Sequence, residues 1–430
     1  MKQRGRHRRR KRGRALRATL AGAALALTAT ATMISASQAT NGDDPGALAP
    51  LSTVAEADAL SLAEDPVPDR SLNRLTEELG APVGVNTVLA ETEGTLRDTD
   101  HCPSADRSAL PVSPEASRAY CWDEDDTRGW RAGAVTTSGD ADDDGRWGRH
   151  QVVLSGWSRT EPGTGPARDL ARVAFVNADE TARPDYSWAL LVVPVDGGRD
   201  YRGLFSGLTG MVWYQDKLVV TTTAGDADAL YVFDLDRIHR ATVTAPTVGR
   251  VDDGWSAAGQ RFVLPAVATY RPAAADGARP DTLSLDRSTT PDTLVASERV
   301  PEAADRASRL WRYRLSTDTA RPGPLSAGTG GRSAPQEAYE TDAADLRGVL
   351  AYRSQWYLSR PADSPDDHGT LWRQDTDGAR ATECGADEVR DCWSGRPAPL
   401  SYWEESGEVW SQSDRTLFAL PLTSLDDALE

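Results

Sequence analysis

Histidine and catalytic signatures are scarce in this chain of 430 residues, which contains only five histidines. No Gly-x-Ser-x-Gly motif provides the nucleophile elbow of a serine hydrolase, and no His-Glu-x-x-His motif provides a zinc site. The Gly-rich segment 328–331 lacks the Lys-Ser/Thr pair of a phosphate-binding loop. These absences favour a protein that is not an enzyme. The alternative is a secreted hydrolase, a glycosidase or a lyase, because separation in space defines a catalytic carboxylate pair and 65 acidic residues are present.

Lysine is nearly missing from most of the chain, since Lys217 is the only one after residue 39. The formal net charge is −17, and the most cationic segment is the first 17 residues, so the remainder is more acidic still. Binding to nucleic acid or to an anionic membrane surface relies on Lys and Arg. We therefore expect no nucleic-acid partner.

Long hydrophobic runs are also missing, and the main apolar stretch near the start is the short, Ala-rich segment 18–30. Ten Lys or Arg residues and no acidic residue precede it, and small residues ending at Ala39 follow it. This order is typical of a secretory signal peptide, and the stretch is shorter than the ~20 apolar residues that span a bilayer. We predict cleavage after Ala39, no membrane span in the mature chain, and an extracellular protein that is released or loosely held at the cell surface.

The chain has no Cys-x-x-Cys motif and only four cysteines. An even number of cysteines in an exported protein indicates disulfides, whereas a zinc site needs closely spaced Cys and His ligands. Both local loops are short, so we predict the pairs Cys102–Cys121 and Cys384–Cys392.

Large apolar residues are few between residue 40 and about residue 68, where Ala, Asp, Pro, Ser and Gly dominate. This composition predicts a disordered, acidic linker. One helix is expected at 70–79, because Leu72, Leu75 and Leu79 share a face and Gly80 stands at the C-cap position. The chain then divides into a signal peptide (1–39), a disordered linker with one short helix (40–100) and a packed domain (101–430).

No long helical period occurs in the packed domain, where short β-branched and aromatic runs alternate with Gly, Asp and Pro, as in an all-β domain. The segments 210–233, 348–373 and 399–420 repeat one order: strand, polar turn, strand, loop, then a strand that opens with Leu and an aromatic residue. A partial copy ends at 310–313. This is the strand order of a propeller blade. With an earlier unit near 147–195, we predict a β-propeller of about five blades, and a pair of β-sandwich sheets is the alternative.

A resemblance to a known family rests on five short runs: Cys-Trp-Asp at 121–123, Trp-Arg-Ala-Gly-Ala-Val-Thr-Thr at 130–137, Trp-Gly at 147–148, Gly-Met-Val-Trp-Tyr at 210–214 and Phe-Asp-Leu at 233–235. Across about 120–430, the chain resembles a group of secreted actinobacterial proteins of the Streptomyces type. Members of that group resemble β-propellers and carry no established activity or catalytic residues. The resemblance therefore implies a fold and a compartment, and it implies no site.

One acidic segment has the opening of a calcium loop. Asp140, Asp142 and Asp144 occupy positions 1, 3 and 5, and Gly145 occupies position 6. Position 12 is Gln151 instead of a bidentate Glu, which weakens the match. We therefore favour a solvated Asp-Gly turn without a cofactor, and a calcium site with the three aspartates as ligands is the alternative.

Tryptophan is abundant, with 13 residues, and their positions suggest two roles. Those within strand patterns, such as Trp213 and Trp311, are expected to fill the space between blades. Those nearer turns are our candidates for contact with a ligand: Trp122, Trp130, Trp147, Trp255, Trp393 and Trp403. The sequence thus predicts a secreted propeller that binds a glycan or an extracellular protein through loops on one face.

Overall fold

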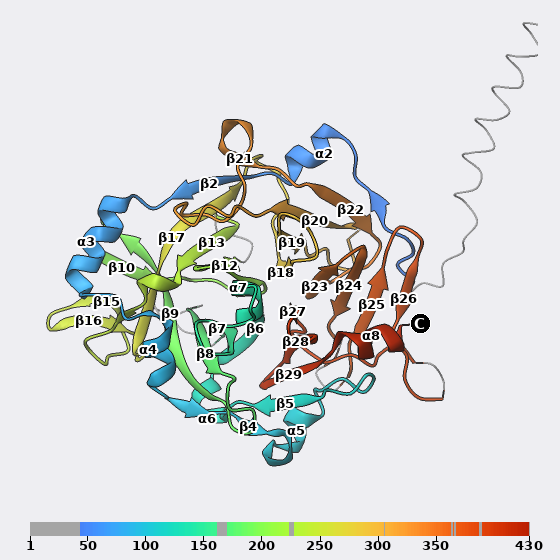
Figure 1. Cartoon of the computed structure of the whole chain (residues 1–430), viewed down its shortest axis with the longest axis horizontal. Coiled ribbons are helices and arrows are strands. Elements are labelled where there is room, and N and C mark those ends of the chain that lie inside the picture. Colours follow the sequence, from blue (N-terminus) through green and yellow to red (C-terminus); the bar gives the residue numbers. More distant parts are fainter. Residues whose placement is uncertain are drawn as a thin grey trace, which may run out of the picture. The chain divides into compact units, whose positions relative to one another are not determined.

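The computed structural model describes residues 44–160, 170–222, 228–304, 306–362, 364, 367–386 and 389–429. The predicted signal peptide at 1–39 lies outside the described residues and stays a prediction. Everything that follows belongs to the unit Pro45–Glu430. Within this unit, five blades of antiparallel strands form a ring around a central axis (Figure 1).

Each blade has four strands, which pair one after another from the axis outwards. The outermost strands of the first two blades also pair with each other in parallel and join these blades into one larger sheet. Blade 1 contains β6 (Trp130–Thr137), β7 (Val152–Arg159), β8 (Ala171–Asn177) and β9 (Asp185–Val195). Blade 2 contains β11 (Met211–Tyr214), β12 (Lys217–Thr221), β13 (Leu230–Asp234) and β17 (Phe262–Pro272). Blade 3 contains β18 (Thr282–Asp286), β19 (Thr293–Ser297), β20 (Ser308–Arg314) and β22 (Glu337–Thr341). Blade 4 contains β23 (Gly348–Tyr352), β24 (Gln355–Arg360), β25 (Thr370–Gln374) and β26 (Ala379–Ala381). Blade 5 contains β27 (Ser401–Trp403), β28 (Glu408–Ser413), β29 (Thr416–Pro421) and β5 (Arg118–Cys121).

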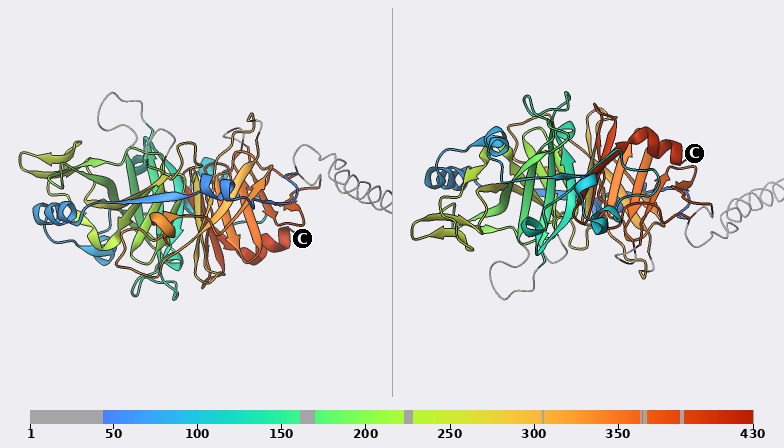
Figure 2. Two further views of the ribbon diagram at one scale, coloured as in Figure 1. Left: turned by 90° about the horizontal axis from the view of Figure 1, so that it is seen from above. Right: turned by 90° about the horizontal axis from the view of Figure 1, so that it is seen from below.

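Blade 5 closes the ring with strands from both ends of the packed domain. β5 precedes blade 1 in the chain, yet it is the fourth strand of blade 5 and pairs with β29, with Ala119 opposite Phe418. Arg118 in β5 also donates hydrogen bonds to both carboxylate oxygens of Glu408 in β28. Side views show the blades standing next to one another around the ring (Figure 2). The prediction of an all-β propeller of about five blades is confirmed, and the sandwich alternative is wrong.

Most of the hydrophobic core lies in the five spaces between neighbouring blades, and a sixth cluster, with Leu75, Tyr201 and Trp255, lies at the outer rim of blades 1 and 2. Each space is filled by its own cluster of buried apolar side chains, and each cluster contains at least one tryptophan that is fully buried or nearly so. Large aromatic rings suit this position because they bury much apolar area between two twisted sheets. One tryptophan from each cluster, in the order of the spaces from blades 1 and 2 to blades 5 and 1, is Trp213, Trp311, Trp356, Trp393 and Trp157.

The segment before β5 forms a belt around the outside of the ring (Figures 1 and 2). It contains β1 (Ala49–Pro50), α2 (Val54–Ala59), β2 (Leu62–Pro66), α3 (Asp69–Leu79), α4 (Gly84–Ala90), β3 (Gly94–Thr95) and β4 (Arg97–Asp98). The belt starts at blade 4, where the Leu48 N–H donates to the Asp375 carbonyl. It then pairs with β22 of blade 3, β17 of blade 2, β9 of blade 1 and β5 of blade 5. The belt therefore passes the outer rim of all five blades, in the reverse of their chain order.

The prediction of a disordered linker over 40–100 is wrong for the described residues from Pro45 onwards. Leu60, Leu62 and Leu75 are buried against the ring, and the belt strands take up hydrogen bonds at the open edges of the blades. The composition of the segment predicts disorder only for an isolated chain, because the apolar surface that it covers is supplied by the blades. The one predicted helix is α3, whose buried face holds Leu72, Leu75 and Leu79 and which ends at Gly80.

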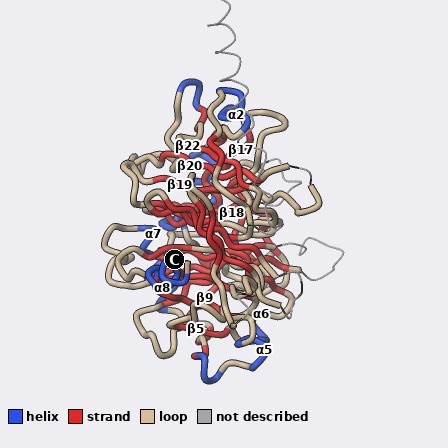
Figure 3. Tube along the Cα trace, turned by 90° about the vertical axis from the view of Figure 1, so that its right-hand side faces the viewer, coloured by secondary structure: helices blue, strands red, loops and turns tan. Residues whose placement is uncertain are grey.

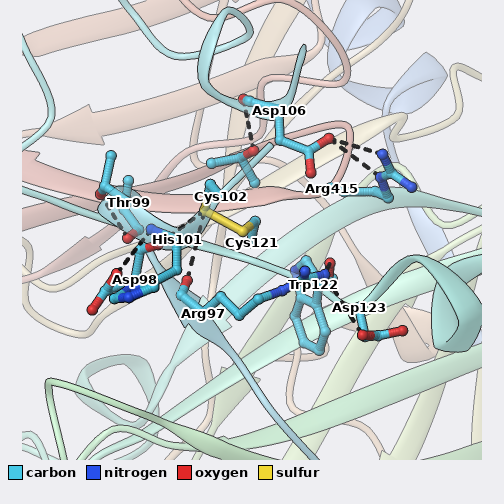
Figure 4. Close-up of a disulfide and its surroundings, with 12 residues drawn as sticks. Arg97, Asp98, Thr99, His101, Cys102, Asp106, Cys121, Trp122, Asp123 and Arg415 are labelled. Carbon is cyan, nitrogen blue, oxygen red and sulfur yellow. Dashed lines mark hydrogen bonds and ion pairs between the residues drawn. A yellow bond between two sulfur atoms is a disulfide. The ribbon is translucent and has the colours of Figure 1, made fainter. Parts of the chain in front are cut away.

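The two predicted disulfides are present, with S–S bonds joining Cys102 to Cys121 and Cys384 to Cys392. The first bridge ties the end of the belt to β5, the strand that closes the ring (Figure 4). Beside it, the carboxylate of buried Asp106 pairs at 3.0 Å with Arg415, in the turn between β28 and β29 (Figure 4).

Smaller elements decorate the rim and the loops, and most helices lie at the periphery of the strands (Figure 3). None of the helices in the described part of the chain is long and apolar enough to cross a bilayer. The smaller elements are η1 (Thr99–His101), α5 (Ser104–Arg107), α6 (Glu124–Thr127), α7 (Ser138–Ala141), β10 (Asp200–Gly203), η2 (Leu235–Arg237), β14 (His239–Arg240), β15 (Val248–Val251), β16 (Gly254–Ala257), η3 (Thr329–Gly331), β21 (Arg332–Ser333) and α8 (Leu422–Ala428).

Candidate ligand-binding site

The turns that follow the first strand of each blade meet on one face of the ring, here called the turn face. Blades with the same strand order run their first strands in the same direction along the axis, so these turns share a face. Contacts between them show the convergence. The Arg353 N–H, after β23, donates to the Ser288 hydroxyl, after β18, at 2.6 Å. The rings of Tyr352 and Tyr402, from blades 4 and 5, lie 4.9 Å apart.

The helical turn α7 directly follows β6 and lies near the middle of the ring (Figure 1). Its carbonyl oxygens accept hydrogen bonds from two other blades: Ala141 from the Gln215 N–H at 3.0 Å, and Asp140 from Arg287 at 2.9 Å. The side chain of Asp140 accepts a bond from Ser401 of blade 5. Blades 1, 2, 3 and 5 therefore all hold α7 at the axis.

Asp140 is the central group of this arrangement. It is 1% exposed, and its Oδ2 accepts hydrogen bonds from the hydroxyls of Thr136 at 2.5 Å and Ser401 at 3.0 Å. Burial raises the pKa of Asp140 to about 6, and the bond from Thr136 and the charge of Arg287 offset part of that rise.

The three candidate calcium ligands are not brought together. Asp140 points inwards to hydroxyl groups, whereas Asp142 and Asp144 are exposed, and Asp144 caps a turn by accepting from the Arg146 N–H. The predicted calcium loop is therefore not formed by these side chains. Gly145, with a φ of +72°, instead supplies the left-handed residue of a tight turn.

A different group of carboxylates lies close together: Asp216, Asp234 and Asp236, whose oxygens fall within 4.8 Å of one another. The ammonium group of Lys217 already pairs with two of them, at 2.6 Å from Asp216 and 3.2 Å from Asp234. The single lysine after residue 39 thus serves as the internal counter-ion of this cluster.

A cavity of about 460 Å³ opens on the turn face beside α7, between the loops of blades 1, 2 and 3. We call it the turn-face cavity. Its walls combine two aromatic rings, one guanidinium group and several carboxylates. The lining residues are Ala141, Asp142, Asp143, Trp147, Tyr214, Gln215, Asp216, Asp236, Arg287, Asp292 and Thr319.

Arg287 organises the charges of this cavity from the turn after β18. One of its amino groups pairs with Asp143 of blade 1 and lies 3.8 Å from Asp292. Burial raises the pKa of Asp292, while the charge of Arg287 lowers it. Burial, followed by the charge of Asp292, raises the pKa of Tyr214 to about 12, so the phenol stays protonated and can donate a hydrogen bond.

Of the six candidate tryptophans, one lines the cavity. Trp147 is partly exposed there and packs on Trp213 with ring centroids 5.0 Å apart. Trp130 is partly exposed at the start of β6, away from the turn face, and its ring covers the guanidinium of Arg172 at 4.0 Å. The remaining four are buried, so the prediction that they contact a ligand is wrong: Trp122, Trp255, Trp393 and Trp403. Neighbouring blades cover Trp122, Trp393 and Trp403, whereas Trp255 packs on Tyr201 in the cluster at the outer rim.

Sequence reasoning did not identify Tyr214, Arg287 and Asp292 as site residues. Tyr214 ends the first strand of blade 2, and Arg287 and Asp292 lie in the turn between the first two strands of blade 3. The repeat alignment places Tyr214 at the end of such a strand, and a comparison of the turns that follow each repeat would have identified it. Arg287 and Asp292 belong to blade 3, where the sequence shows only a partial repeat.

No protein-family model and no curated protein sequence matches the chain. Among solved structures, the chain has a likeness to "Drosophila Semaphorin 1a, extracellular domains 1-2", with 10% sequence identity and a TM-score of 0.24, over 64% of this chain and 72% of that one. At that TM-score the likeness carries no argument about fold or function. The resemblance to the actinobacterial group stays a prediction, and the propeller assignment rests on the strand order described above.

Proposed function

We propose that this protein is a secreted, non-enzymatic propeller that binds a glycan, with the turn-face cavity as its binding site. The observation that carries the proposal is the position of Trp147, a partly exposed ring among hydrogen-bonding side chains in this cavity. An aromatic ring can stack on the apolar face of a sugar, while carboxylates, a phenol and a guanidinium bond its hydroxyl groups.

The size and composition of the surface favour a glycan over an extracellular protein as the ligand. A cavity of about 460 Å³ lies within the range of small-molecule sites, ~300–1,000 Å³. Large apolar side chains that are well exposed are few and scattered in the described part of the chain, and none of them lines the cavity: Val54, Val112, Phe205 and Val389. A protein-docking patch would be expected to gather such residues.

Export is part of the proposal and rests on two observations. The N-terminal residues have the order of a signal peptide, and both pairs of cysteines are joined as disulfides. Disulfides persist in oxidising compartments.

The test is a glycan array with the mature chain, residues 40–430, followed by calorimetric titration of any glycan that binds. The Trp147→Ala variant is expected to weaken binding at least about fivefold, since an aromatic contact at a binding site contributes more than ~1 kcal/mol. Phe205→Ala is the matched control, because Phe205 is 37% exposed and lies outside the cavity. Equal affinity of the two variants, or binding to proteins alone, would refute the glycan site.

A secreted glycosidase is the second candidate, and one observation favours it. Burial raises the pKa of Asp292, which lines the cavity together with other carboxylates, and a raised pKa is typical of a general acid. In hydrolysis a protonated Asp292 would give its proton to the leaving glycosidic oxygen, while a second carboxylate takes a proton from the water that adds to the sugar carbon. Turnover of an array glycan that is lost in Asp292→Asn would favour this candidate over binding alone.

A further inference from the structure

We propose that the turn-face cavity selects glycans that carry protonated amino groups, such as polymers of unsubstituted glucosamine. This inference rests on the proposed glycan site and adds the charge of the ligand. Three observations support it: carboxylates outnumber cationic groups around the cavity, the cationic groups already form ion pairs, and aromatic rings line the same cavity.

The cavity is lined by more negative than positive groups. Five aspartates and one arginine contribute to its walls: Asp142, Asp143, Asp216, Asp236, Asp292 and Arg287. A concave surface that carries one sign of charge concentrates its field on the ligand and draws in the opposite charge.

Among the described residues of the wall, the only guanidinium group is that of Arg287, and it already pairs with other groups of the protein. Arg287 pairs with Asp143 and Asp292 and also donates to the carbonyl of Asp140. One positive charge is thus shared by two carboxylates, and it is held by a backbone acceptor as well. Arg287 therefore cannot neutralise the other aspartates on the wall.

Around Asp216 and Asp236, too, the carboxylates outnumber the cationic side chains that pair with them. Lys217 pairs with Asp216 and Asp234, whereas Asp236 is exposed and has no ion pair at all among the described residues. Partial burial and the charges of Asp234 and Asp216 raise the pKa of Asp236, and the charge of Lys217 offsets part of that rise. Arg237 pairs with Asp234 at 3.7 Å, so three carboxylates share two cationic side chains here. Oδ1 of Asp216 is buried and also lacks a hydrogen-bond donor in the described part of the chain.

An organic cation fits this cavity better than a bare metal ion. The ammonium of Lys217 already lies between Asp216 and Asp234, so a metal would have to displace it. An amino sugar would leave that pair in place, bring its own ammonium to Asp236 or Asp142, and lay its ring against Trp147. The face of an aromatic ring also attracts a nearby cation.

A matched pair of ligands separates the charge of the sugar from its shape. The mature chain is titrated at pH 6 with a tetramer of glucosamine and with a tetramer of N-acetylglucosamine, in 0.05 M and 0.5 M NaCl. The charged tetramer is expected to bind at least about tenfold more tightly at low salt, and the difference should shrink at high salt. Equal binding of the two, or tighter binding of the acetylated one, overturns this inference and leaves the glycan site intact. Binding only to other, neutral glycans does the same, whereas a chain that binds no glycan overturns both proposals.

Charge variants test whether the cavity is responsible. Asp236→Asn and Asp142→Asn are each expected to weaken binding of the glucosamine tetramer by up to about fivefold, as for one partly exposed ion pair, and to leave the acetylated tetramer unaffected. Asp253→Asn is the control, since it makes the same charge change on the exposed turn between β15 and β16. An effect of Asp253→Asn as large as that of Asp236→Asn would overturn the inference, because net charge alone would then explain the preference.

Discussion

The hydroxyl of Ser401 donates a hydrogen bond at 3.0 Å to Oδ2 of Asp140, a residue 261 positions earlier in the chain. This contact joins the first strand of blade 5 to the helical turn that follows the first strand of blade 1. Together with the bonds from Gln215 and Arg287, it holds α7 at the axis, where α7 forms one wall of the turn-face cavity.

We expect Asp140→Asn to change how the stability of the protein depends on pH. Burial raises the pKa of Asp140 from 3.8 to about 6 in the folded state, so the unfolded chain loses this proton first as the pH rises. The free energy of unfolding of the native protein should therefore fall between about pH 4 and pH 6, by on the order of 3 kcal/mol for this group. Asparagine does not ionise, so the variant should lack this loss.

Urea unfolding of both proteins at pH 4, 5, 6 and 7 measures the effect. Relative to the native protein, Asp140→Asn should gain stability as the pH rises, whatever the offset between them at pH 4. Asp144→Asn, at an exposed carboxylate nearby, should run parallel to the native protein. A constant difference between Asp140→Asn and native protein across this range would contradict the prediction.

Buried and partly exposed tryptophans should differ in what their substitution changes: stability for the buried ring and ligand affinity for the exposed one. Trp393→Ala removes a fully buried ring between blades 4 and 5 and should lower the free energy of unfolding by about 3–5 kcal/mol. Trp147→Ala removes a partly exposed ring and should cost less stability, while it lowers affinity for the glycan. Thermal unfolding and calorimetric titration of both variants check this, and a larger loss of stability from Trp147→Ala would go against the assignment.

Buried side chains of the belt should contribute to the stability of the protein as much as side chains of the hydrophobic core do. Leu62→Ala, in β2, should lower the free energy of unfolding by about 2–5 kcal/mol, because Leu62 is fully buried against the ring. Val54→Ala is the control, since Val54 is 78% exposed in α2, and it should change the free energy by no more than about 0.5 kcal/mol. If Leu62→Ala were as mild as Val54→Ala, the belt would not be packed on the blades as described.

The disulfides should differ in their effect according to the loops that they close. In the chain-entropy view, losing Cys102–Cys121, with a separation of 19 residues, should cost about 3 kcal/mol. Losing Cys384–Cys392, with a separation of 8, should cost about 2.5 kcal/mol. The double serine variants of each pair, compared by urea unfolding, give the two values. Cys102–Cys121 also anchors β5, the strand that closes the ring, so its loss should lower the free energy of unfolding more. A larger decrease on loss of Cys384–Cys392 would contradict that role.

Much of the fold could be predicted because each blade repeats a local pattern. The units at 210–233, 348–373 and 399–420 became blades 2, 4 and 5, and the partial copy at 310–313 lies in blade 3. Alternation of apolar and polar residues and short polar turns are properties of neighbouring residues, so one sequence shows them. The short spacings of the cysteines likewise predicted the two bridges.

The belt and the site could not be predicted in the same way, because their partners lie far away in the sequence. A segment poor in large apolar residues is ordered here since the rims of five blades provide the strand edges and apolar surface that it lacks. The spacing of Asp140, Asp142 and Asp144 suggested one cluster, yet Ser401 and Thr136 take Asp140 inwards and leave the other two in solvent. Trp393 and Trp403 sit near turns in the sequence, and neighbouring strands nevertheless bury them.

The sequence by itself determined the β-strands, their grouping into about five like units, the two disulfide pairs and the acidic charge of the chain, because these depend on composition and on residues close to one another. Only the tertiary structure decided that the belt crosses every blade, that α7 lies at the axis and that Trp147, Tyr214, Arg287 and Asp292 share a cavity. The physical reason is ring closure, which brings the turns of separate blades to one face and exposes or buries each side chain according to its neighbours in space.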